Sequence, residues 1–574
     1  MTTAAIILCP DLPATGLRQS MHDPTIPLDV FDIFNALVIS GNDNEVGNDI
    51  TRSLIVDAIR RVHSSGVQRV FEHHQERCPQ MPIIQQIDTK KTEFWQLGAI
   101  YENEGTIAGT YNVHQRIFLN QFGLSSPEDP TSQDHNDFND RLWLVYGDQL
   151  TAHHIRSVKH EQFDASKPFD RRRWLLGILA WFHIQMNLLL TIVRTHWSPG
   201  RGDQRTHHCL ESDIIAMGRT LTSRDNIKYH LTEPVVSQSF TARVLALFYA
   251  AMETKGYLAD VQSNPYYFER PEHIDEAISR LTTGEFLELV EEIRLTAFTL
   301  DAWNGNGHTD PEFKTMCRML QEIELFLTVR HAVKHGDIGM LRRLVDPLIV
   351  YFFGAFQSNY GNEMLFYRWN LSPVNTSELQ HAILASGLVN WHGRRTTFKA
   401  VDLGLEHLNG SCKIEMKCYK NSTHDANIIF DRVCLTNTWI RGLRTKIEAT
   451  FGEDMPGTHT TSSVGMDMFT LARNIFKGDL CTPRKVAEQT YSGYESEDIL
   501  CNGMEVLAQK VESFNKQHIQ HSATSDEGDL SQEDYTVLTD IQEYGSIITE
   551  AMDEAGDPAI VAPMIDGNIE GFMG

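Results

Sequence analysis

Asp148 is the residue whose type and position point most directly to chemistry. It follows the clearest strand in the sequence, Arg141–Tyr146 (RLWLVY), and Gly147, and it precedes an expected helix over Gln149–Glu161. Ligands and metals bind at the carboxyl ends of strands in α/β sheets, so a carboxylate at this point favours a binding or catalytic site. The same position also suits an N-cap of the following helix. The spacing alone leaves both interpretations open.

His183 and Glu363 are the next candidates. His183 lies where an apolar segment, Trp174–Trp181, passes into a helix, so it could face the same sheet edge as Asp148 and orient a ligand or metal. A hydrogen-bonded core histidine is the alternative. Glu363 opens an expected helix after an apolar run. It could be a metal ligand, or a carboxylate that the helix dipole favours in a first turn.

Two further polar pairs have helical spacing. His331 and His335 are four residues apart and share a helix face that could bind a metal, but no third ligand stands in register. Asp402 and Glu406 have the same spacing and form a polar face without an assigned purpose. The sequence has no G-x-x-x-x-G-K-[ST], G-x-G-x-x-G or G-x-S-x-G motif, so nucleotide hydrolases, dinucleotide enzymes and serine hydrolases are unsupported.

Basic residues concentrate in one part of an acidic chain. Residues 141–205 contain ten Lys and Arg against five Asp and Glu, although the whole chain has a net charge of −26. The arginines expected to contact nucleic-acid phosphates are Arg171, Arg172, Arg173, Arg194 and Arg201. A local positive face of this kind is typical of proteins that bind nucleic acid. Charge-balanced exposure to solvent is the alternative.

The acidic residues gather at the C-terminus. Between Ser522 and Gly574 there are thirteen Asp and Glu and no Lys or Arg, which is half of the net negative charge. This composition predicts a solvated, disordered tail. The tail could bind a protein partner, or it could serve only to keep the chain soluble.

Cysteine usage and hydropathy indicate an intracellular protein outside the membrane. The nine Cys include no CxxC pair, so free thiols are expected rather than a disulfide framework or a zinc ribbon. The apolar stretch Trp174–Val193 is long enough to span a bilayer. It contains His183, Gln185 and Asn187, which are costly in hydrocarbon, so we predict a buried strand followed by a buried helix.

The order of elements predicts a mixed α/β fold that is mostly helical overall. Strand, carboxylate, helix, strand and helix follow one another between residues 141 and 197, which is an α/β pattern. Helical periodicity dominates afterwards, and Asp310 and Asp337 stand where N-caps are expected. The expected organisation is an N-terminal mixed segment (1–130), an α/β core (131–209 and 345–420) interrupted by a helical insertion (210–344), a helical C-terminal region (421–521) and the acidic tail (522–574).

The order of several short motifs resembles a known family. The chain carries YENEGTIAGTYNV (101–113), YGDQLT (146–151), FDRRRWL (169–175), WFHIQM (181–186), RHAVKHGD (330–337), NYGNEML (359–365) and LVNWHG (388–393). This order resembles a fungal family of uncharacterised proteins with a Gly-Asp-Gln-Leu-Thr motif, which looks like a relic of a mobile-element transposase. The similarity covers roughly residues 1–420.

The resemblance implies a degenerate RNase H-like sheet core with a large helical insertion. A nuclease of this class holds two Mg²⁺ ions about 4 Å apart between carboxylates. Asp148 would then be the metal ligand after a middle strand, Glu363 the metal ligand on a late helix, and His183 an auxiliary residue near the metals. Mg²⁺ would be the cofactor only if catalysis survives.

The sequence departs from the family pattern in its first carboxylate. Family members carry an Asp-Asn-Phe-Asn strand, whereas the start of this chain, Thr2-Thr3, resembles the stretch just downstream of it. Before Asp148, only Asp88 after PIIQQI offers a substitute. We therefore expect a truncated, catalytically impaired transposase-derived protein that contacts DNA, in the nucleus rather than the cytoplasm. A helical protein-interaction scaffold without a nucleic-acid role and an active two-metal nuclease are the alternatives.

Overall fold

The computed structural model of the chain describes residues 4–8, 16–39, 45–73, 77–123, 138–197, 209–219, 224, 227–258, 268–307, 310–417, 432–437, 439–440, 443, 464–478, 481, 483 and 495–518. Arg201 and the acidic tail lie outside the described residues. Helices dominate, and three two-stranded sheets accompany them. A mixed α/β fold that is mostly helical is therefore confirmed.

The predicted strand–helix–strand–helix unit is present. Strands β3 (Trp143–Gly147) and β4 (Leu175–Leu179) pair in parallel, and α6 (Gln149–Glu161) connects them. Gly147 lies opposite Leu179, so both strands end at the same edge of the pair. Helix α7 (Trp181–His196) follows β4 directly and is buried along almost its whole length. The stretch expected as a buried strand and a buried helix is thus confirmed.

Two antiparallel pairs lie near this unit. β1 (Ala5–Leu8) pairs with β2 (Glu93–Gln96), and β5 (Leu388–Asn390) pairs with β6 (Phe398–Ala400). An apolar cluster joins all three sheets and consists of Ile7, Tyr146, Ala180, Val389, Trp391 and Val401. The described strands pair only within these three two-stranded sheets.

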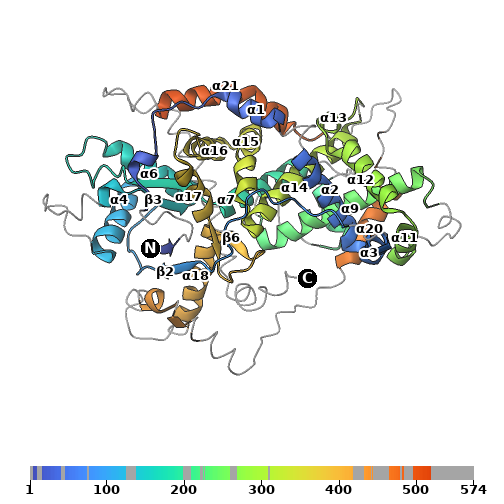
Figure 1. The fold of residues 1–574 in the computed structure, drawn as a ribbon, viewed down its shortest axis with the longest axis horizontal. Helices are drawn as coiled ribbons and strands as arrows, with labels where there is room; N and C mark the ends of the chain where they lie inside the picture. The colour runs from blue at the N-terminus through green and yellow to red at the C-terminus, as the bar shows by residue number, and fades with distance from the viewer. Residues whose placement is uncertain are drawn as a thin grey trace.

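A second part of the molecule is purely helical in the described residues. It lies on the right of Figure 1 and contains α2 (Glu45–Val62), α3 (Ser64–His73), α8 (Leu210–Ala216), α9 (Tyr229–Thr254), α11 (Pro271–Ile278), α12 (Thr283–Ala297), α13 (Leu300–Trp303), α14 (Pro311–His335) and α20 (Val464–Lys477). Helices α2 and α3 pack on α9, α11 and α12, whereas β1 and β2 lie with the α/β part. The segment 1–130 therefore contributes elements to both parts.

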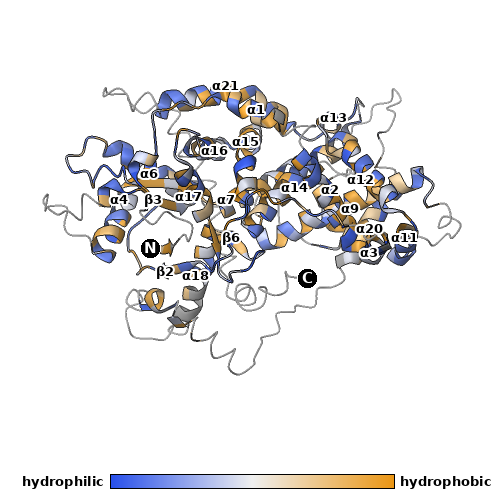
Figure 2. Cartoon of the chain, viewed as in Figure 1, coloured by the Kyte–Doolittle hydropathy of each residue, from blue (hydrophilic) through white to orange (hydrophobic). Residues whose placement is uncertain are grey.

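The remaining helices connect or cover the two parts. They are the short 3-10 helix η1 (Gln19–Met21), α1 (Val30–Ile39), α4 (Ile107–Gln115), the π-helical η2 (Arg116–Gln121), α15 (Ile338–Gly354), α16 (Ser358–Asn370), α17 (Ser377–Ser386), α18 (Val401–Lys417) and α21 (Ile499–His518). Helix α21 runs with α1 across the top of the molecule in Figure 1. Figure 2 shows bands of hydrophobic and hydrophilic residues along α21, as expected of a helix with one buried face.

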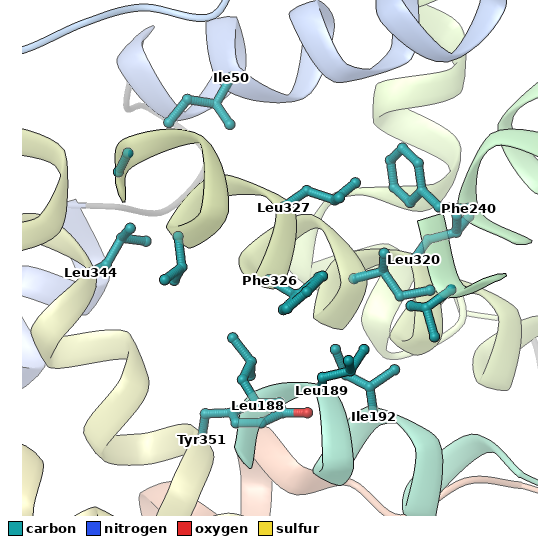
Figure 3. Packing of buried hydrophobic residues seen from close by; sticks show 14 of the residues in the cluster. Ile50, Leu188, Leu189, Ile192, Phe240, Leu320, Phe326, Leu327, Leu344 and Tyr351 are labelled. Atoms are coloured by element: carbon teal, nitrogen blue, oxygen red, sulfur yellow. The ribbon is translucent and has the colours of Figure 1, made fainter. Parts of the chain in front are cut away.

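One continuous apolar core spans the central helices. Side chains of α7, α9, α14 and α15 converge in Figure 3, and those labelled from these helices are Leu188, Leu189, Ile192, Phe240, Leu320, Phe326, Leu327, Leu344 and Tyr351. Burial of such side chains stabilises a fold by roughly 1.5–3 kcal/mol each. Helix α7 therefore fixes the position of the α/β unit relative to the helical part.

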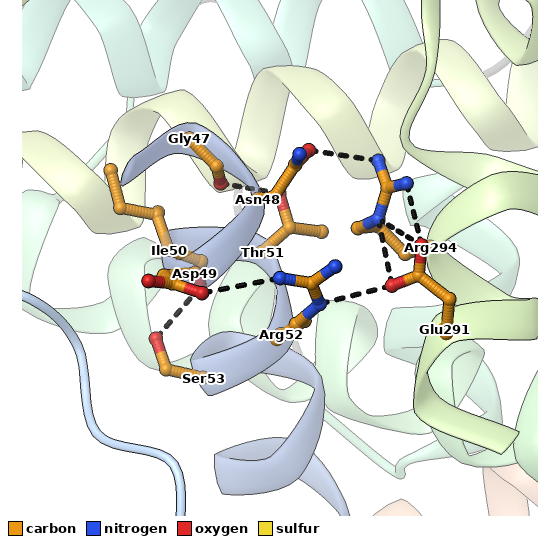
Figure 4. Close-up of polar contacts among 9 residues, drawn as sticks. All are labelled: Gly47, Asn48, Asp49, Ile50, Thr51, Arg52, Ser53, Glu291 and Arg294. Atoms are coloured by element: carbon orange, nitrogen blue, oxygen red, sulfur yellow. Dashed lines mark hydrogen bonds and ion pairs between the residues drawn. The ribbon is translucent and has the colours of Figure 1, made fainter. Parts of the chain in front are cut away.

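Polar contacts set the packing of α2 against α12. Glu291 accepts hydrogen bonds from Arg52 (Nε–Oε2, 3.0 Å) and Arg294 (Nη2–Oε1, 2.7 Å), and Arg294 also donates to Asn48 at 2.9 Å (Figure 4). These hydrogen bonds, led by that of Arg294, lower the pKa of Glu291. The N-terminal segment is thus attached to the helical part by charged groups as well as by its core.

The predicted helix caps are confirmed. The Asp310 carboxylate accepts the N–H groups of Glu312 and Phe313 at the start of α14. The Asp337 carboxylate accepts the N–H of Met340 at the start of α15, and it also accepts N–H groups from residues 84 and 85. Asp337 is fully buried. One acid therefore both begins a helix and anchors an extended segment.

One helix matches a membrane span by length and composition. Among the described residues it is α9, and 94% of its apolar window is buried inside the protein. Core helices pass the same test, so this match is weak evidence for a membrane span.

Candidate functional site

The structure places Asp148 as the N-cap of α6. Its carboxylate accepts the N–H of Thr151 at 2.7 Å, and the side chain is half-buried at the carboxyl end of β3. The capping role that the sequence left open is therefore real. Asp148 also lies at the carboxyl edge of the strand pair, as predicted, because β3 ends one residue earlier.

His183 lies at the same edge, in the first turn of α7. Its Nδ1 atom is 2.8 Å from Oδ2 of Asp402, which is the second residue of α18. The same carboxylate accepts the backbone N–H groups of Phe182 (3.2 Å) and His183 (3.1 Å). Because Ala180 provides no side-chain cap, Asp402 closes the start of α7 from another element.

The pKa of His183 is raised by acids on several elements. Burial opposes protonation, but the hydrogen bond and charge of Asp402, with the charges of Asp148 and Glu406, raise the pKa above its usual value. His183 is 5% exposed. The neighbouring carboxylates, Asp402 first, therefore favour the charged imidazole over the neutral one.

Glu363 forms a buried ion pair with an arginine of α6. Its carboxylate accepts a hydrogen bond from Nη2 of Arg156, and Glu363 is 3% exposed. Burial raises the pKa of Glu363, and the negative charge of Asp148 adds to this effect. The contacts with Arg156 and Gln149 act in the opposite direction. The expectation that Glu363 stands in the first turn of its helix is wrong: α16 begins at Ser358, so Glu363 is its sixth residue.

The three sequence-predicted residues are therefore neighbours. Tyr360, one turn before Glu363, is buried, and burial followed by the charges of Asp148, Glu363 and Asp402 raises its pKa. Asp148 thus acts electrostatically on both His183 and Glu363. The structure gathers these residues from three elements at the carboxyl edge of β3 and β4.

Sequence reasoning missed the partners of these residues. Asp402 was recognised only as half of a polar pair with Glu406, and Arg156 and Tyr360 were not singled out. A signal for Asp402 exists, because it comes two residues after the end of β6, much as Asp148 comes directly after β3. Arg156 carried no such signal, since its role depends on α16 packing over α6.

The cluster as built is a set of paired charges. Glu363 is neutralised by Arg156, Asp402 by His183, and Asp148 caps a helix. Among the residues that the structure describes, no group of three or more His, Cys, Asp and Glu has a geometry that could hold a metal ion. His331 and His335 stack at 3.8 Å between ring centroids, and His335 Nδ1 lies 2.9 Å from the carbonyl oxygen of His331.

The three consecutive arginines have different surroundings. Arg172 is fully buried, with its guanidinium over the rings of Phe169 (4.3 Å) and Tyr111 (4.7 Å). The sequence suggested that Arg172 contacts nucleic acid. The structure instead buries this side chain, which holds the local core together. Arg173 is exposed, and half-buried Arg171 donates to the carbonyl of Ala165 at 2.6 Å.

The remaining predicted arginines lie elsewhere. Arg194 is half-buried in the last turn of α7, two residues before His196, which pairs with Glu322 of α14 at 3.1 Å. It therefore lies near the C-terminal end of α7. Arg201 falls outside the described residues.

A group of basic residues, named here the basic cluster, lies beside the carboxylates. It consists of Arg156, Lys159 and Arg173. Lys159 is one turn after Arg156 on α6, and its Nζ donates to the carbonyl of Leu175 at 2.9 Å, two residues after Arg173. Burial, then the charges of Arg156 and Arg173, lower the pKa of Lys159 to about 8. In the described part of the chain, no ion pair joins Lys159 or Arg173 to a carboxylate.

Comparison with other proteins gives a family. Searches of curated proteins and of solved structures gave no match. A family model described as a family of unknown function (DUF6589) matches residues 35–459, which is well over half of the chain. The chain therefore belongs to this family of unknown function.

Proposed function

We propose that this chain is a degenerate, transposase-derived protein of RNase H-like ancestry that binds nucleic acid in the nucleus and has lost most or all catalysis. The fungal family with a Gly-Asp-Gln-Leu-Thr motif is the proposed origin. Nucleic-acid phosphates are the proposed ligand, and the basic cluster is the proposed contact. Double-stranded DNA is the expected partner.

The observation that carries this proposal is the unbalanced charge of the basic cluster. Lys159 and Arg173 have no ion-pair partner in the described residues, and Arg156, which is paired with Glu363, adjoins them. Like charges held together destabilise a fold unless an anion binds there. Phosphate oxygens are anions that Lys and Arg bind strongly.

An exposed aromatic side chain favours nucleic acid over a free anion as the ligand of the basic cluster. The Arg173 guanidinium lies 5.5 Å from the centroid of the Phe163 ring, and Phe163 is 48% exposed. Aromatic faces beside a basic groove stack unpaired bases, and arginine adds to this contact. The same face could therefore bind a single strand as well as a duplex.

The arrangement of the carboxylates supports the ancestry and the loss of catalysis. Asp148 after a strand and Glu363 on a later helix, close to each other, are what a two-metal nuclease needs for two of its ligands. The Glu363 carboxylate is already paired with Arg156, however, and the positive charge of Arg156 would oppose the binding of a metal ion. We infer that an arginine has replaced the metal as the partner of Glu363. If a metal did bind, it would be Mg²⁺ between Asp148 and Glu363.

Salt-dependent DNA binding tests the proposal. Anisotropy of a labelled 30-base-pair duplex should show binding at about 50 mM salt, with an affinity that falls steeply as salt increases. The double variant Lys159→Gln/Arg173→Gln should reduce the slope of log K against log salt by about two. The matched control is Lys477→Gln/Arg280→Gln, which removes two exposed cations from the helical part and should keep the slope.

Three outcomes would overturn the proposal. Absence of binding at low salt, together with recovery of a protein partner, would favour the scaffold. An unchanged slope in the Lys159→Gln/Arg173→Gln variant would place the contact elsewhere. Mg²⁺-dependent nicking that Asp148→Asn abolishes would identify an active nuclease instead.

A further inference from the structure

One buried side chain fixes the shape of the turn between β5 and β6. Asn390, at the end of β5, is fully buried, and its Oδ1 accepts the N–H of Gly393 at 2.9 Å and the hydroxyl of Thr397 at 2.8 Å. Its Nδ2 donates to the carbonyl of Arg394 at 2.8 Å. The motif LVNWHG (388–393), to which the proposed function gives no role, therefore leads into a turn that a core residue organises.

The segment that leads into β2 lies against this turn. The N–H of Thr92 donates to the carbonyl of Asn390, and the N–H of Asn390 donates to the hydroxyl of Thr92, both at 2.8 Å. A Cβ at Gly393, whose φ is +65°, would lie 3.2 Å from the backbone nitrogen of Lys91. Lys91 is therefore next to the turn, although about 300 residues separate the two in the chain.

The turn and this segment are rich in positive charge. Residues 388–400 contain three Lys and Arg and no acid, and residues 88–93 contain two Lys and two acids. One of those acids, Asp88, pairs with Lys90 at 2.8 Å. Five cations against two acids therefore form a positive surface on an acidic chain.

Three of these cations face solvent without a carboxylate partner. Lys91, Arg394 and Arg395 are exposed, and no ion pair within the described part of the chain involves them. Burial, then the positive charges of Lys399, Arg394 and Lys91, lower the pKa of His392 in the turn, so these charges lie close together. A ligand with several negative charges would relieve their mutual repulsion.

An exposed aromatic ring lies on the same face as Lys91. Exposed and more buried side chains alternate along residues 91–96, so Lys91, Glu93 and Trp95 share the exposed face. Trp95 is 50% exposed, and four extended residues place it about 13 Å from Lys91. An aromatic face beside cations stacks unpaired bases, and a duplex keeps its bases paired.

We propose that the exposed surface of Lys91, Trp95, Arg394 and Arg395, named here the loop patch, binds single-stranded nucleic acid. This inference rests on the proposed function only in taking nucleic acid as the ligand, and it does not depend on the basic cluster. The three cations would bind phosphate oxygens, and Trp95 would stack on an unpaired base. An acidic peptide would satisfy the cations but would leave the exposed ring without a stacking partner.

Anisotropy of a labelled 15-nucleotide thymidine strand with the full chain at about 50 mM salt tests the loop patch. We expect binding that Arg394→Gln/Arg395→Gln weakens by about tenfold or more and Trp95→Ala by about fivefold or more. Trp95→Phe keeps an aromatic ring and should retain most of the affinity, which separates stacking from a folding defect. Phe31→Ala, which removes a 68% exposed ring from α1, is the matched control and should leave the affinity unchanged.

Several results would count against the loop patch. Absence of single-strand binding at low salt, or an unchanged affinity in Arg394→Gln/Arg395→Gln, would refute it. An unchanged affinity in Trp95→Ala, or displacement of the strand by poly-glutamate as readily as by an unlabelled strand, would show a surface for anions in general and refute the single-stranded ligand. The proposed function fails separately, because Lys159→Gln/Arg173→Gln is judged on the duplex and should leave single-strand binding at the loop patch unchanged.

Discussion

The carboxylate of Asp402 joins two parts of the chain that are 219 residues apart, because it accepts the Nδ1 hydrogen of His183 at 2.8 Å and the first N–H groups of α7. It therefore acts as the cap that Ala180 cannot provide. It also fixes which imidazole nitrogen faces the acid. This contact attaches α18 to the edge of the parallel strand pair.

The stability of the protein should depend on pH through His183. Because its pKa is raised in the folded state, protonation of His183 stabilises the fold fully below the unfolded value of about 6.5. This contribution disappears as the pH rises through the folded-state value. Asp402→Asn should therefore cost about 2–3 kcal/mol at pH 6 and less at pH 9, measured by urea unfolding. An equal cost at both values would contradict the charged pair.

Substitutions of Asp148 separate its capping role from a metal role. Asn caps helices about as well as Asp, so Asp148→Asn should change the free energy of unfolding by less than about 0.5 kcal/mol. Asp148→Ala should cost about 1 kcal/mol because the Thr151 N–H loses its acceptor. Thermal unfolding of both variants decides this. A large loss in Asp148→Asn would mean that the negative charge, rather than the cap, is what the fold needs.

The Arg156–Glu363 pair should be strongly coupled. Glu363→Gln leaves a largely buried guanidinium without its anion, and we expect a loss of about 2–3 kcal/mol, less than for a fully buried pair since Arg156 is 21% exposed. The double variant Arg156→Gln/Glu363→Gln should lose less than the sum of the two single variants. Urea unfolding of the four proteins measures the coupling energy. Strict additivity would show that the two side chains act independently.

Arg172 and Arg173 should have opposite phenotypes although they are adjacent. Arg172→Gln removes a buried cation from the faces of Phe169, Tyr111 and Trp174, and it should cost about 2–4 kcal/mol without a specific effect on DNA binding. Arg173→Gln is an exposed change and should stay within about 0.5 kcal/mol while weakening DNA binding. Unfolding and DNA titrations of both variants test this contrast. A stable Arg172→Gln protein with weakened DNA binding would reverse the assignment.

Helix α21 should depend on glycine at position 503. A Cβ at Gly503 would overlap the carbonyl oxygen of Val350 on α15, and one at Gly354 would overlap that of Ile499. The two backbones therefore approach where neither has a side chain. Gly503→Ala should push α21 off α15 and make it sensitive to limited proteolysis. Gly123→Ala is a control for proteolysis, since nothing described lies within 4 Å of its added Cβ, although its positive φ adds local strain. An intact α21 in Gly503→Ala would contradict this packing.

The local pattern of the sequence was sufficient for the elements that carry the candidate site. The run that became β3, the helix Gln149–Glu161 and the caps Asp310 and Asp337 follow from neighbouring residues, because hydrophobic periodicity and capping are local effects. The apolar stretch after Trp174 was also predicted correctly as a buried strand and helix. Membership of an uncharacterised family was also predicted correctly, from the order of short motifs along the chain.

Tertiary structure alone decided what the charged side chains do. The sequence gives Arg171, Arg172 and Arg173 the same chemistry, yet a backbone with φ of 53° at Arg172 turns that side chain into an aromatic core. Likewise, Glu363 meets Arg156 only because α16 packs over α6, with 207 residues between them in the chain. Pairing of charges across such separations depends on how helices pack, and local sequence carries no record of that contact. The sequence therefore determined the elements and the candidates, and the packing decided their partners.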